Sequence, residues 1–317
     1  MRMIAAAEVE AALDETTLIE ALRAMFREDC ATPVRTHHTV AVPGAPDATL
    51  LFMPAWQSGR EIGVKLVTVH PGNADRGKPS VQGIYVLIDA TTGNVLALMD
   101  APTLTVKRTA CASALAATYL ARADAARLLV LGTGALAPHL VRAHAAARPI
   151  RSVRIWGRNP AKSEALARRL AQSGLAVEAA TDLEAAVAEA DIVSCATMTH
   201  EPLVHGAWLR PGQHLDLVGG YTPAMREADD EAVRRARVFV DTRAGATKEA
   251  GDIVQPLQSG VLREAAIQGD LYELCRGARP GRQGPGEITF FKSVGAALED
   301  LAAARLVLDK SGGPTAA

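Results

Sequence analysis

The chain has 317 residues, 49% hydrophobic and 22% charged, which is typical of a globular protein with one large or two ordinary domains. Its formal net charge is −1 and only 4% of its residues are aromatic, so no basic field or set of stacking side chains indicates a nucleic-acid partner. No run reaches the roughly 18 apolar residues of a membrane span, and no apolar signal segment precedes Glu8. We expect a cytoplasmic protein without membrane or nucleic-acid partners.

The cysteines and histidines do not form metal-ligand patterns. The four cysteines are scattered without a CxxC pair, which favours reduced thiols over disulfides or a zinc site. His37 and His38 are adjacent and would point to opposite faces of a strand. His139 and His144 are five residues apart, which misses the i, i+4 spacing of a zinc helix. We therefore expect no metal.

The first part of the chain, residues 1–122, mixes a helix with strands. Leu13–Phe26 has helical spacing of its apolar residues. Glycine, proline, asparagine and aspartate then separate short runs with strand character, and 91–94 has the composition of a hairpin turn. The predicted strands are Thr39–Val42, Thr49–Met53, Ile62–Val69, Gly83–Asp89 and Val95–Met99.

From residue 123 the pattern changes to alternating strands and helices. Short, continuous apolar strands between helices predict a parallel sheet covered on both faces. The predicted strands are Leu128–Leu131, Val153–Trp156, Val177–Ala180, Ile192–Ala196, Leu215–Val218 and Val238–Val240, and the first two helices are Ala135–Ala147 and Ala161–Gln172.

Phe290–Leu308 forms a last strand-and-helix unit, whose helix can pack back on the first domain. We thus expect an α/β fold with two domains, 1–122 with the returning helix 296–310, and a Rossmann domain at 123–295. Ser311–Ala317 is expected to be a disordered tail.

A glycine-rich turn is the strongest single motif. Gly132-Thr133-Gly134-Ala135, followed by Ala137, gives G-x-G-x-x-A between a predicted strand and a predicted helix. The first glycine permits a tight turn, the second lets backbone approach a pyrophosphate, and the small Ala137 allows close helix–strand packing. The motif predicts dinucleotide binding.

The residues that follow the predicted strand Val153–Trp156 indicate whether NAD(H) or NADP(H) is bound. An NAD enzyme usually carries an acid there, whereas this chain has Trp156-Gly157-Arg158-Asn159. Arg158 suits a 2′-phosphate, with Asn159 and Lys162 able to assist, so the sequence favours NADP(H), NADPH being preferred over NADH. Arg158 can also be read as a solvated surface charge. Thr197 and Val218, at the carboxyl ends of two further strands, are additional cofactor candidates.

Several segments occur together in one order along nearly the whole chain. They are Met53-Pro54-Ala55, Gly63-Val64-Lys65, Asn73 with Lys78-Pro79-Ser80, Asp89-Ala90-Thr91-Thr92-Gly93, Leu104-Thr105 with Arg108-Thr109-Ala110, the glycine-rich turn, Trp156-Gly157-Arg158-Asn159, Val218-Gly219-Gly220 with Pro223 and Arg226-Glu227, and Ile288–Gly295. In this combination the chain resembles the ornithine cyclodeaminase/mu-crystallin family.

The resemblance implies a homodimer whose first domain binds a small amino or imino acid and forms the subunit contact. The family's cationic carboxylate site matches Arg35, Lys65 and Arg108, with Ser80 where a threonine is frequent, and Gly295 of the last segment is a cofactor candidate. An arginine fork with a lysine charge suits a carboxylate.

Lys65 lies in an apolar run, so it is either buried with an anionic partner or faces outward on a half-exposed strand. Arg35 and Arg108 alone could be surface arginines.

One departure from the family pattern concerns the reaction. Where the cyclodeaminase branch has an aspartate after Val-Gly-Gly, this chain has Tyr221, and the next carboxylate is Glu227. The segment is more similar to the ketimine reductase branch, which reduces 1-pyrroline-2-carboxylate to L-proline and 1-piperideine-2-carboxylate to L-pipecolate. Arg35, Lys65 and Arg108 would hold the carboxylate, and Lys65, if a proton donor is needed, would supply the proton.

Alternatives remain open at this point. They are a cyclodeaminase or amino-acid dehydrogenase of the same family, and a protein that binds NADP(H) or a ligand without turnover. Cys111 can line the pocket or be a small buried side chain. Asp252 can reach the cofactor cleft or cap a helix.

Overall fold

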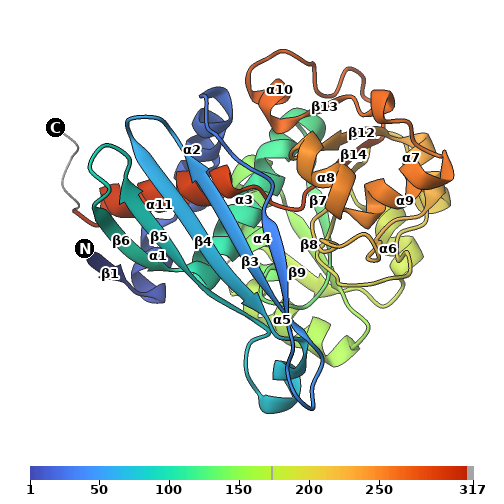
Figure 1. Ribbon diagram of the computed structural model, residues 1–317. Coiled ribbons are helices and arrows are strands. Elements are labelled where there is room, and N and C mark those ends of the chain that lie inside the picture. The colour runs from blue at the N-terminus through green and yellow to red at the C-terminus, as the bar shows by residue number, and fades with distance from the viewer. Residues whose placement is uncertain (173, 313–317) are drawn as a thin grey trace. The chain divides into compact units, whose positions relative to one another are not determined.

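The computed structural model describes residues 1–172 and 174–312 (Figure 1). The chain divides into two compact units, Met1–Arg108 with Ala296–Ala317, and Thr109–Gly295. The α/β fold class predicted from the sequence is confirmed. Of the expected tail Ser311–Ala317, residues 313–317 lie outside the described residues.

The first unit is built on a six-stranded sheet in the order β1-β6-β5-β4-β3-β2. Its neighbouring strands are antiparallel except for β1 and β6. The five strands predicted for this region occur in the structure and each is longer than predicted. β2 begins three residues and ends two residues earlier than predicted, and β1 was not predicted. The bounds are β1 Arg2–Ile4, β2 Thr36–Val40, β3 Ala48–Trp56, β4 Glu61–Val69, β5 Val81–Asp89 and β6 Val95–Asp100, with a 3-10 turn at Pro71–Arg76.

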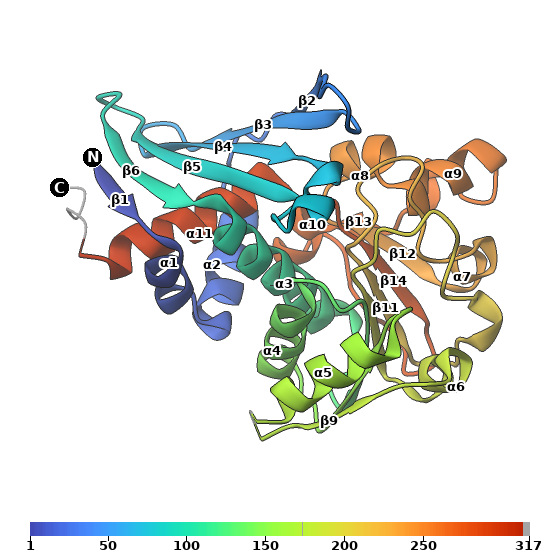
Figure 2. The ribbon, with the colours of Figure 1, turned by 90° about the horizontal axis from the view of Figure 1, so that it is seen from below.

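Three helices of this unit, α1 (Ala6–Ala12), α2 (Glu15–Arg27) and α11 (Ala297–Lys310), lie on one side of the sheet (Figure 2). Asp14 caps α2 by accepting from the backbone N–H of Thr17. α11 packs against α2, β3 and β4. Because most of α11 is buried, its side chains are placed next to the core face of β4.

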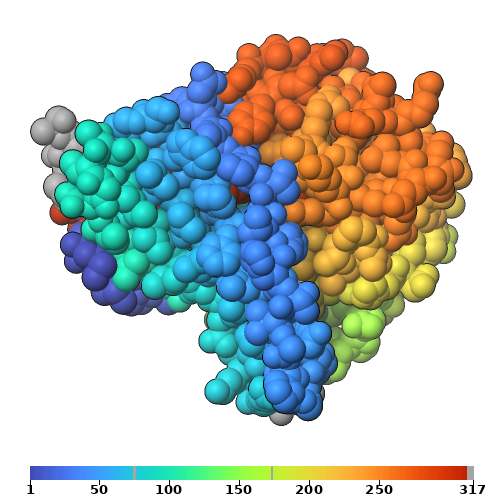
Figure 3. All heavy atoms as spheres, viewed as in Figure 1, coloured from blue at the N-terminus to red at the C-terminus, as the bar shows by residue number. Residues whose placement is uncertain are grey.

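The opposite face of this sheet is uncovered within the unit, as the space-filling view shows for β3 to β6 (Figure 3). Strand residues alternate between buried and partly or fully exposed, so one face packs on the helices. The other face is nevertheless apolar, with Phe52 38% and Trp56 37% exposed. Its partly buried members include Pro54, Ile62, Val64, Leu66, Ile84, Val86, Ile88, Leu96 and Leu98.

The second unit contains an eight-stranded sheet in the order β13-β12-β14-β11-β10-β7-β8-β9. All its neighbouring strands are parallel, as predicted. Its strands β9, β8, β7, β10 and β11 are adjacent in the order found in dinucleotide-binding sheets. The strand order reverses between β7 and β10, which is the topological switch point where such sheets bind their ligand. The bounds are β7 Arg127–Leu131, β8 Ser152–Trp156, β9 Ala176–Ala179, β10 Ile192–Cys195, β11 His214–Leu217, β12 Arg237–Val240, β13 Gly269–Asp270 and β14 Thr289–Lys292.

Helices lie on both sides of this sheet, with α4 and α5 on one side and α6 and α7 on the other (Figure 2). The bounds are α4 Ala137–Ala147, α5 Pro160–Ala171, α6 Leu183–Glu189, α7 Asp230–Arg235, α8 Arg243–Glu249, α9 Gly251–Ser259 and α10 Leu271–Cys275, with 3-10 turns at Gly206–Trp208 and Glu264–Ala266. α4 begins two residues later than predicted because 134–136 still belong to the glycine-rich turn.

The longest helix, α3 (Ala101–Leu120), was not predicted. Its apolar residues surround the helix rather than forming one stripe, so the periodic signal is weak. The two units meet in sequence inside this continuous helix, after Arg108, whereas we expected a boundary near residue 122. No linker composition marks the change because the backbone hydrogen bonds of α3 run through it.

Two kinds of feature are absent from the described parts of the chain. Over 1–172 and 174–312, no helix is long and apolar enough to cross a bilayer. Within the same residues, no group of three or more histidine, cysteine, aspartate or glutamate side chains is arranged to hold a metal ion.

Candidate functional site

The first unit contains a buried ionic cluster formed by Lys65, Arg108, Glu299 and Asp300, which we call the Lys65 cluster. Lys65 Nζ donates to Asp300 Oδ1 at 2.8 Å. Arg108 donates from Nε to the same oxygen at 2.9 Å and from Nη1 to Glu299 Oε2 at 2.6 Å. Strand β4, helix α3 and helix α11 each contribute to it, so three distant segments meet at one carboxylate.

The structure decides between the two readings of Lys65. Lys65 lies on the helix-covered face of β4 and is only 1% exposed, and Arg108 is 3% exposed. Both carboxylates are fully buried. An outward-facing lysine and a surface arginine at position 108 are therefore excluded. Buried charges require close opposite charges, and the carboxylates of α11 provide them.

The pKa of Lys65 is lowered to about 7, first by burial and then by the positive charges of Arg108 and Arg35, against the raising effect of Asp300. Burial also disfavours the charged form of Arg108, but Asp300 and Glu299 outweigh it and raise its pKa. Arg108 is thus a permanent cation, whereas Lys65 can release or accept a proton near neutrality.

Arg35 lies near this cluster, as its effect on Lys65 shows. It is half-buried, and its Nη1 is 3.9 Å from the sulfur of Met53, which faces Lys65 in the β3–β4 register. Ser80 stands apart from these contacts, just before β5, where its carbonyl accepts from the backbone N–H of His70. Three of the four predicted substrate residues are therefore brought together.

Tyr85 on β5 lies opposite Lys65 and is fully buried. Burial, followed by the charge of Asp300, raises the pKa of its hydroxyl well above the ordinary value. Its Oη has no hydrogen-bond partner in 1–172 or 174–312. A Cβ at Gly63 would overlap this hydroxyl, which explains a glycine in the middle of β4.

Sequence reasoning missed Glu299, Asp300 and Tyr85. The two acids stand next to each other in the run Ala297-Leu298-Glu299-Asp300-Leu301, which is otherwise apolar. Adjacent acids inside a buried helix could have indicated buried cationic partners.

In the second unit, the glycine-rich turn connects β7 to α4. Gly132 has φ +121°, and a Cβ there would lie 2.7 Å from the carbonyl oxygen of Ala196. A Cβ at Gly134 would contact nothing within 4 Å, so space lies open above that residue. Thr133 is half-buried and Ala135 exposed, while Ala137 is fully buried at the start of α4. No side chain caps this helix N-terminus.

The predicted 2′-phosphate residues follow β8. Gly157 approaches the glycine-rich turn, since a Cβ there would lie 2.8 Å from Thr133 Cγ2. Arg158 and Lys162 are exposed. Asn159 is also exposed, but its side chain caps α5 by accepting from the backbone N–H of Lys162 at 3.3 Å. The guanidinium of Arg158 is therefore exposed to solvent just after the end of β8.

Thr197, Val218 and Gly295 lie at the carboxyl ends of β10, β11 and β14. Thr197 and Val218 are half-buried. Gly295 has φ +81° and donates its N–H to the buried Asp241 at 2.7 Å. These three residues and the glycine-rich turn share the sheet edge at which open parallel sheets bind ligands.

The residues at this edge fit a dinucleotide. The open space above Gly134, the positive φ of Gly132 and the uncapped start of α4 together form a backbone cradle for a pyrophosphate. The exposed guanidinium of Arg158, after the end of β8, lies at the same edge of the sheet.

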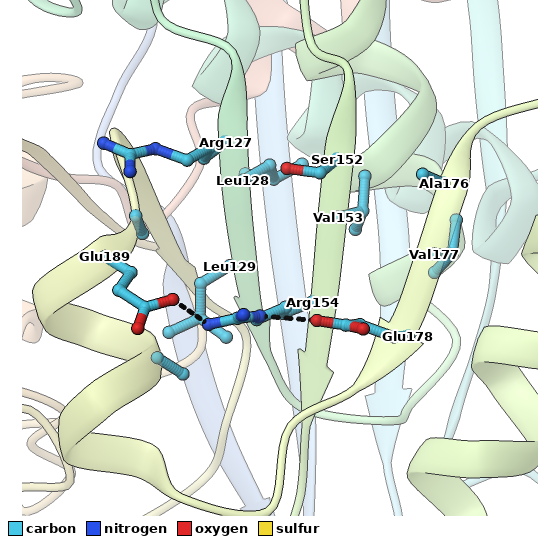
Figure 4. A pocket seen from close by; sticks show the side chains of 12 residues that line it. Arg127, Leu128, Leu129, Ser152, Val153, Arg154, Ala176, Val177, Glu178 and Glu189 are labelled. Atoms are coloured by element: carbon cyan, nitrogen blue, oxygen red, sulfur yellow. Dashed lines mark hydrogen bonds and ion pairs between the residues drawn. The ribbon is translucent and has the colours of Figure 1, made fainter.

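A separate cavity of about 340 Å³ lies on the sheet of the second unit, lined by β7, β8, β9 and α6 (Figure 4). Its wall includes Arg127, Ser152 and Ala176, which are the first residues of their strands. Arg154 crosses it between Glu178 and Glu189 and forms an ion pair with each (Figure 4). The cavity is thus at the amino ends of strands, away from the candidate cofactor edge.

A buried serine, aspartate and histidine also occur in the second unit, but not in a hydrolase arrangement. Asp216 Oδ2 accepts from Ser194 Oγ at 2.6 Å and lies 3.3 Å from His144 Nε2. The aspartate, not the histidine, is the middle member, and all three are fully buried. A serine nucleophile needs the histidine as its base, so this group is structural.

The ornithine cyclodeaminase/mu-crystallin family model matches residues 1–313. The chain is 42% identical to a Delta(1)-pyrroline-2-carboxylate reductase of Paracoccus denitrificans, over 81% of this chain and 82% of that protein. It is 36% identical to the ketimine reductase mu-crystallin of Mus musculus, over 87% and 84%. A Thermococcus litoralis Delta(1)-pyrroline-2-carboxylate reductase, solved with NADH and L-proline, superposes with a TM-score of 0.93 at 32% identity, covering 100% of both chains.

Proposed function

The chain belongs to the ornithine cyclodeaminase/mu-crystallin family, and we propose that it is an NADPH-dependent reductase of a small cyclic ketimine carboxylate. The substrates we propose are 1-pyrroline-2-carboxylate, giving L-proline, and 1-piperideine-2-carboxylate, giving L-pipecolate. Relatives named as Delta(1)-pyrroline-2-carboxylate reductase and ketimine reductase support this reaction class.

The observation that carries the proposal is the gathering of cationic donors around Lys65. Arg35, Lys65 and Arg108 lie close together in the first unit, beside the carboxylates of Glu299 and Asp300. Guanidinium forks and a lysine ammonium are the donors that suit a substrate carboxylate.

In the reaction we propose, NADPH supplies the hydride, which is added to the imine carbon next to the carboxylate. Arg35 and Arg108 hold the carboxylate and so orient the ring. Lys65 Nζ holds the proton that the imine nitrogen needs for the carbon to accept hydride. A pKa of about 7 suits an acid that must give up its proton near neutral pH. Asp300 fixes the position of Nζ.

For the cofactor, Gly132, Thr133, Gly134 and Ala135 would hold the pyrophosphate, and Thr197, Val218 and Gly295 would line the nicotinamide half. Arg158, with Asn159 and Lys162 beside it, supports a preference for the 2′-phosphate of NADPH over NADH. The solved Thermococcus litoralis relative contains NADH and so gives no support for NADPH. The proposed preference for NADPH is therefore based on Arg158 of this chain.

Ornithine cyclodeamination is disfavoured by the absence of a suitable carboxylate. Position 221 is a tyrosine, and Glu227, the next acid along the chain, is fully buried and accepts backbone hydrogen bonds. Two other functions are possible alternatives to the reductase: an amino-acid dehydrogenase, and a protein that binds the cofactor without turnover.

We also propose that the protein forms a homodimer through the uncovered sheet face of the first unit. That face presents side chains from five strands, including Phe52, Trp56 and Val64, and its centre is apolar. Exposed apolar surfaces of this extent usually mark association sites. A second copy would present the same face, which is what a two-fold contact requires.

The test is reduction of the two cyclic imines by purified protein, with NADPH and NADH in parallel, followed by loss of nicotinamide absorbance and by identification of the amino acid formed. Fast NADPH oxidation with stoichiometric L-proline or L-pipecolate is expected. Turnover of ornithine with ammonia release would instead identify a cyclodeaminase. Cofactor binding without reduction of any imine would identify a binding protein.

A further inference from the structure

The second unit contains a second fully buried ionic group, formed by Glu227, Asp252 and Lys292, which we call the Glu227 cluster. Lys292 Nζ lies 2.9 Å from Asp252 Oδ2 and 3.6 Å from Glu227 Oε2. All three side chains are 0% exposed. Two buried carboxylates with one cation are costly to maintain, so their contacts need an explanation beyond packing.

Glu227 joins the ends of two adjacent parallel strands. Its Oε1 accepts from both the backbone N–H and the hydroxyl of Thr197, each at 2.8 Å. Its Oε2 accepts from the backbone N–H groups of Gly219 and Gly220 at 2.9 and 3.3 Å. Thr197 follows β10 and the glycines follow β11, so a single carboxylate sets the spacing of the two strand-end loops.

The packing between these loops leaves little freedom. A Cβ at Gly219 would overlap the backbone of Thr197 and lie 2.6 Å from Glu227 Oε1. Asp252 in turn holds the backbone of Glu227, accepting its N–H at 2.7 Å and that of Ala228 at 3.1 Å. Asp252 therefore supports Glu227 rather than capping α9, whose N-cap is Ala250, and its reach into the cofactor cleft stays a prediction.

The charge state of Glu227 matters because its Oε2 accepts from two backbone N–H groups, which can only donate. A proton on Oε2 would displace at least one of them. The pKa of Glu227 is raised to about 7, chiefly by burial and also by the charge of Asp252, while Lys292 and Thr197 lower it. The other ionisable groups that interact with the cluster are Cys195, at the end of β10, and Asp241, directly after β12.

We propose that Glu227 is a positioning residue that, through Thr197 and Gly219-Gly220, holds the strand-end loops in the geometry that binds the nicotinamide half of the cofactor. Protonated Glu227 releases at least one of these loops. The inference rests on the proposed nicotinamide cofactor, and it assigns a positioning role to a fully buried residue.

The experiment measures binding of NADH and NADPH to the intact protein by fluorescence titration from pH 6 to pH 8. NADH is the probe for the pH dependence because it lacks the titrating 2′-phosphate. In the wild type, the Kd is expected to rise several-fold as the pH falls through about 7. Glu227→Gln keeps the shape but loses the charge, and is expected to bind about tenfold more weakly with no such pH dependence.

Thr197→Val provides a milder second variant if Glu227→Gln folds poorly. It removes one of the four donors, and since Thr197 lowers the pKa of Glu227, the pH at which binding weakens should move upward.

Asp191→Asn is the matched control. Asp191 is also buried and accepts two backbone N–H groups, from Ala126 and Arg127 at 2.9 Å, but it lies before β10, at the amino end of the strand. It should lower thermal stability and leave the pH dependence of the Kd unchanged.

Hydrogen exchange gives a readout independent of the cofactor. Amides of 197–199 and 219–221 should exchange faster in Glu227→Gln, and those of 126–127 in Asp191→Asn. Equal NADH affinity and equal pH dependence in wild type and Glu227→Gln would overturn the inference while leaving the proposed function intact. A wild type that binds neither dinucleotide would overturn both.

Discussion

Lys65 and Asp300 are 235 positions apart in the chain, yet Lys65 Nζ and Asp300 Oδ1 are 2.8 Å apart in a fully buried ion pair. The contact joins the middle of β4 to the first turn of the last helix. It makes the ionisation of a candidate catalytic lysine depend on a carboxylate from the far end of the sequence.

Removing that carboxylate should shift the pH dependence of imine reduction. Lys65 acts as an acid only when protonated, so kcat/KM should fall as the pH rises through about 7. Asp300 raises the pKa of Lys65, and in Asp300→Asn this fall should therefore occur about one pH unit or more lower. The control is Glu299→Gln, which removes the charge of a carboxylate that accepts from Arg108 rather than from Lys65. Superimposable pH profiles of Asp300→Asn and wild type would exclude this electrostatic link.

Removing the lysine itself should reduce turnover and leave cofactor binding unchanged. Lys65→Met is expected to lower kcat/KM by at least about a hundredfold, the usual contribution of a general acid, without changing the Kd for NADPH. Lys107→Met is a matched control, because Lys107 is also buried but pairs with Glu10 at 3.1 Å. Lys65→Met activity near that of wild type would remove Lys65 from the mechanism.

Arg158 should decide between the two dinucleotides. Arg158→Ala is expected to weaken NADPH binding about tenfold or more while leaving NADH binding unchanged, because only NADPH carries the 2′-phosphate. Arg154→Ala, on the preceding strand, removes an arginine that pairs with Glu178 at 2.7 Å and should affect both cofactors equally or not at all. Equal weakening of NADPH and NADH by Arg158→Ala would contradict the assignment.

The two glycines of the turn should respond differently to the same methyl group. Gly134→Ala should fold with near-normal stability, since its Cβ meets no atom within 4 Å, but lose affinity for either dinucleotide because the methyl occupies the open space. Gly132→Ala should lower the melting temperature, since φ is +121° and the Cβ would meet the Ala196 carbonyl. Thermal melting and cofactor titration of both variants test this. A Gly134→Ala variant that binds normally would place the pyrophosphate elsewhere.

A charge on the uncovered sheet face should dissociate the proposed dimer. Val64 lies in the centre of that face, opposite Val86. Val64→Glu is expected to shift the protein to a monomer in sedimentation experiments, because an unpaired charge would be buried in the contact. Glu20→Gln, on the exposed side of α2, is the control and should not change the assembly state. A wild type that is already monomeric would refute the dimer.

Patterns of neighbouring residues were enough to predict much of this protein. The apolar runs of 128–131 and 192–196 indicated parallel strands, and Gly132 and Gly134 indicated the turn, because strand period and backbone geometry are encoded within a few residues. Helix α3 was not predicted because it is apolar on all sides, which removes the periodic pattern of apolar residues that indicates a helix.

Only the tertiary structure decided the charge relationships. The alternation of β4 allowed Lys65 to face either way, and the sequence offered no partner for it. Its partner comes from α11, and the donors to Glu227 come from loops after β10 and β11. A buried charge is stable only where folding brings an opposite charge or donors within a few ångströms, and no local pattern records which distant segment will do so. The sequence by itself therefore determined the strands, the glycine-rich turn and the residue types of the candidate site, and the fold decided which of those residues act on one another.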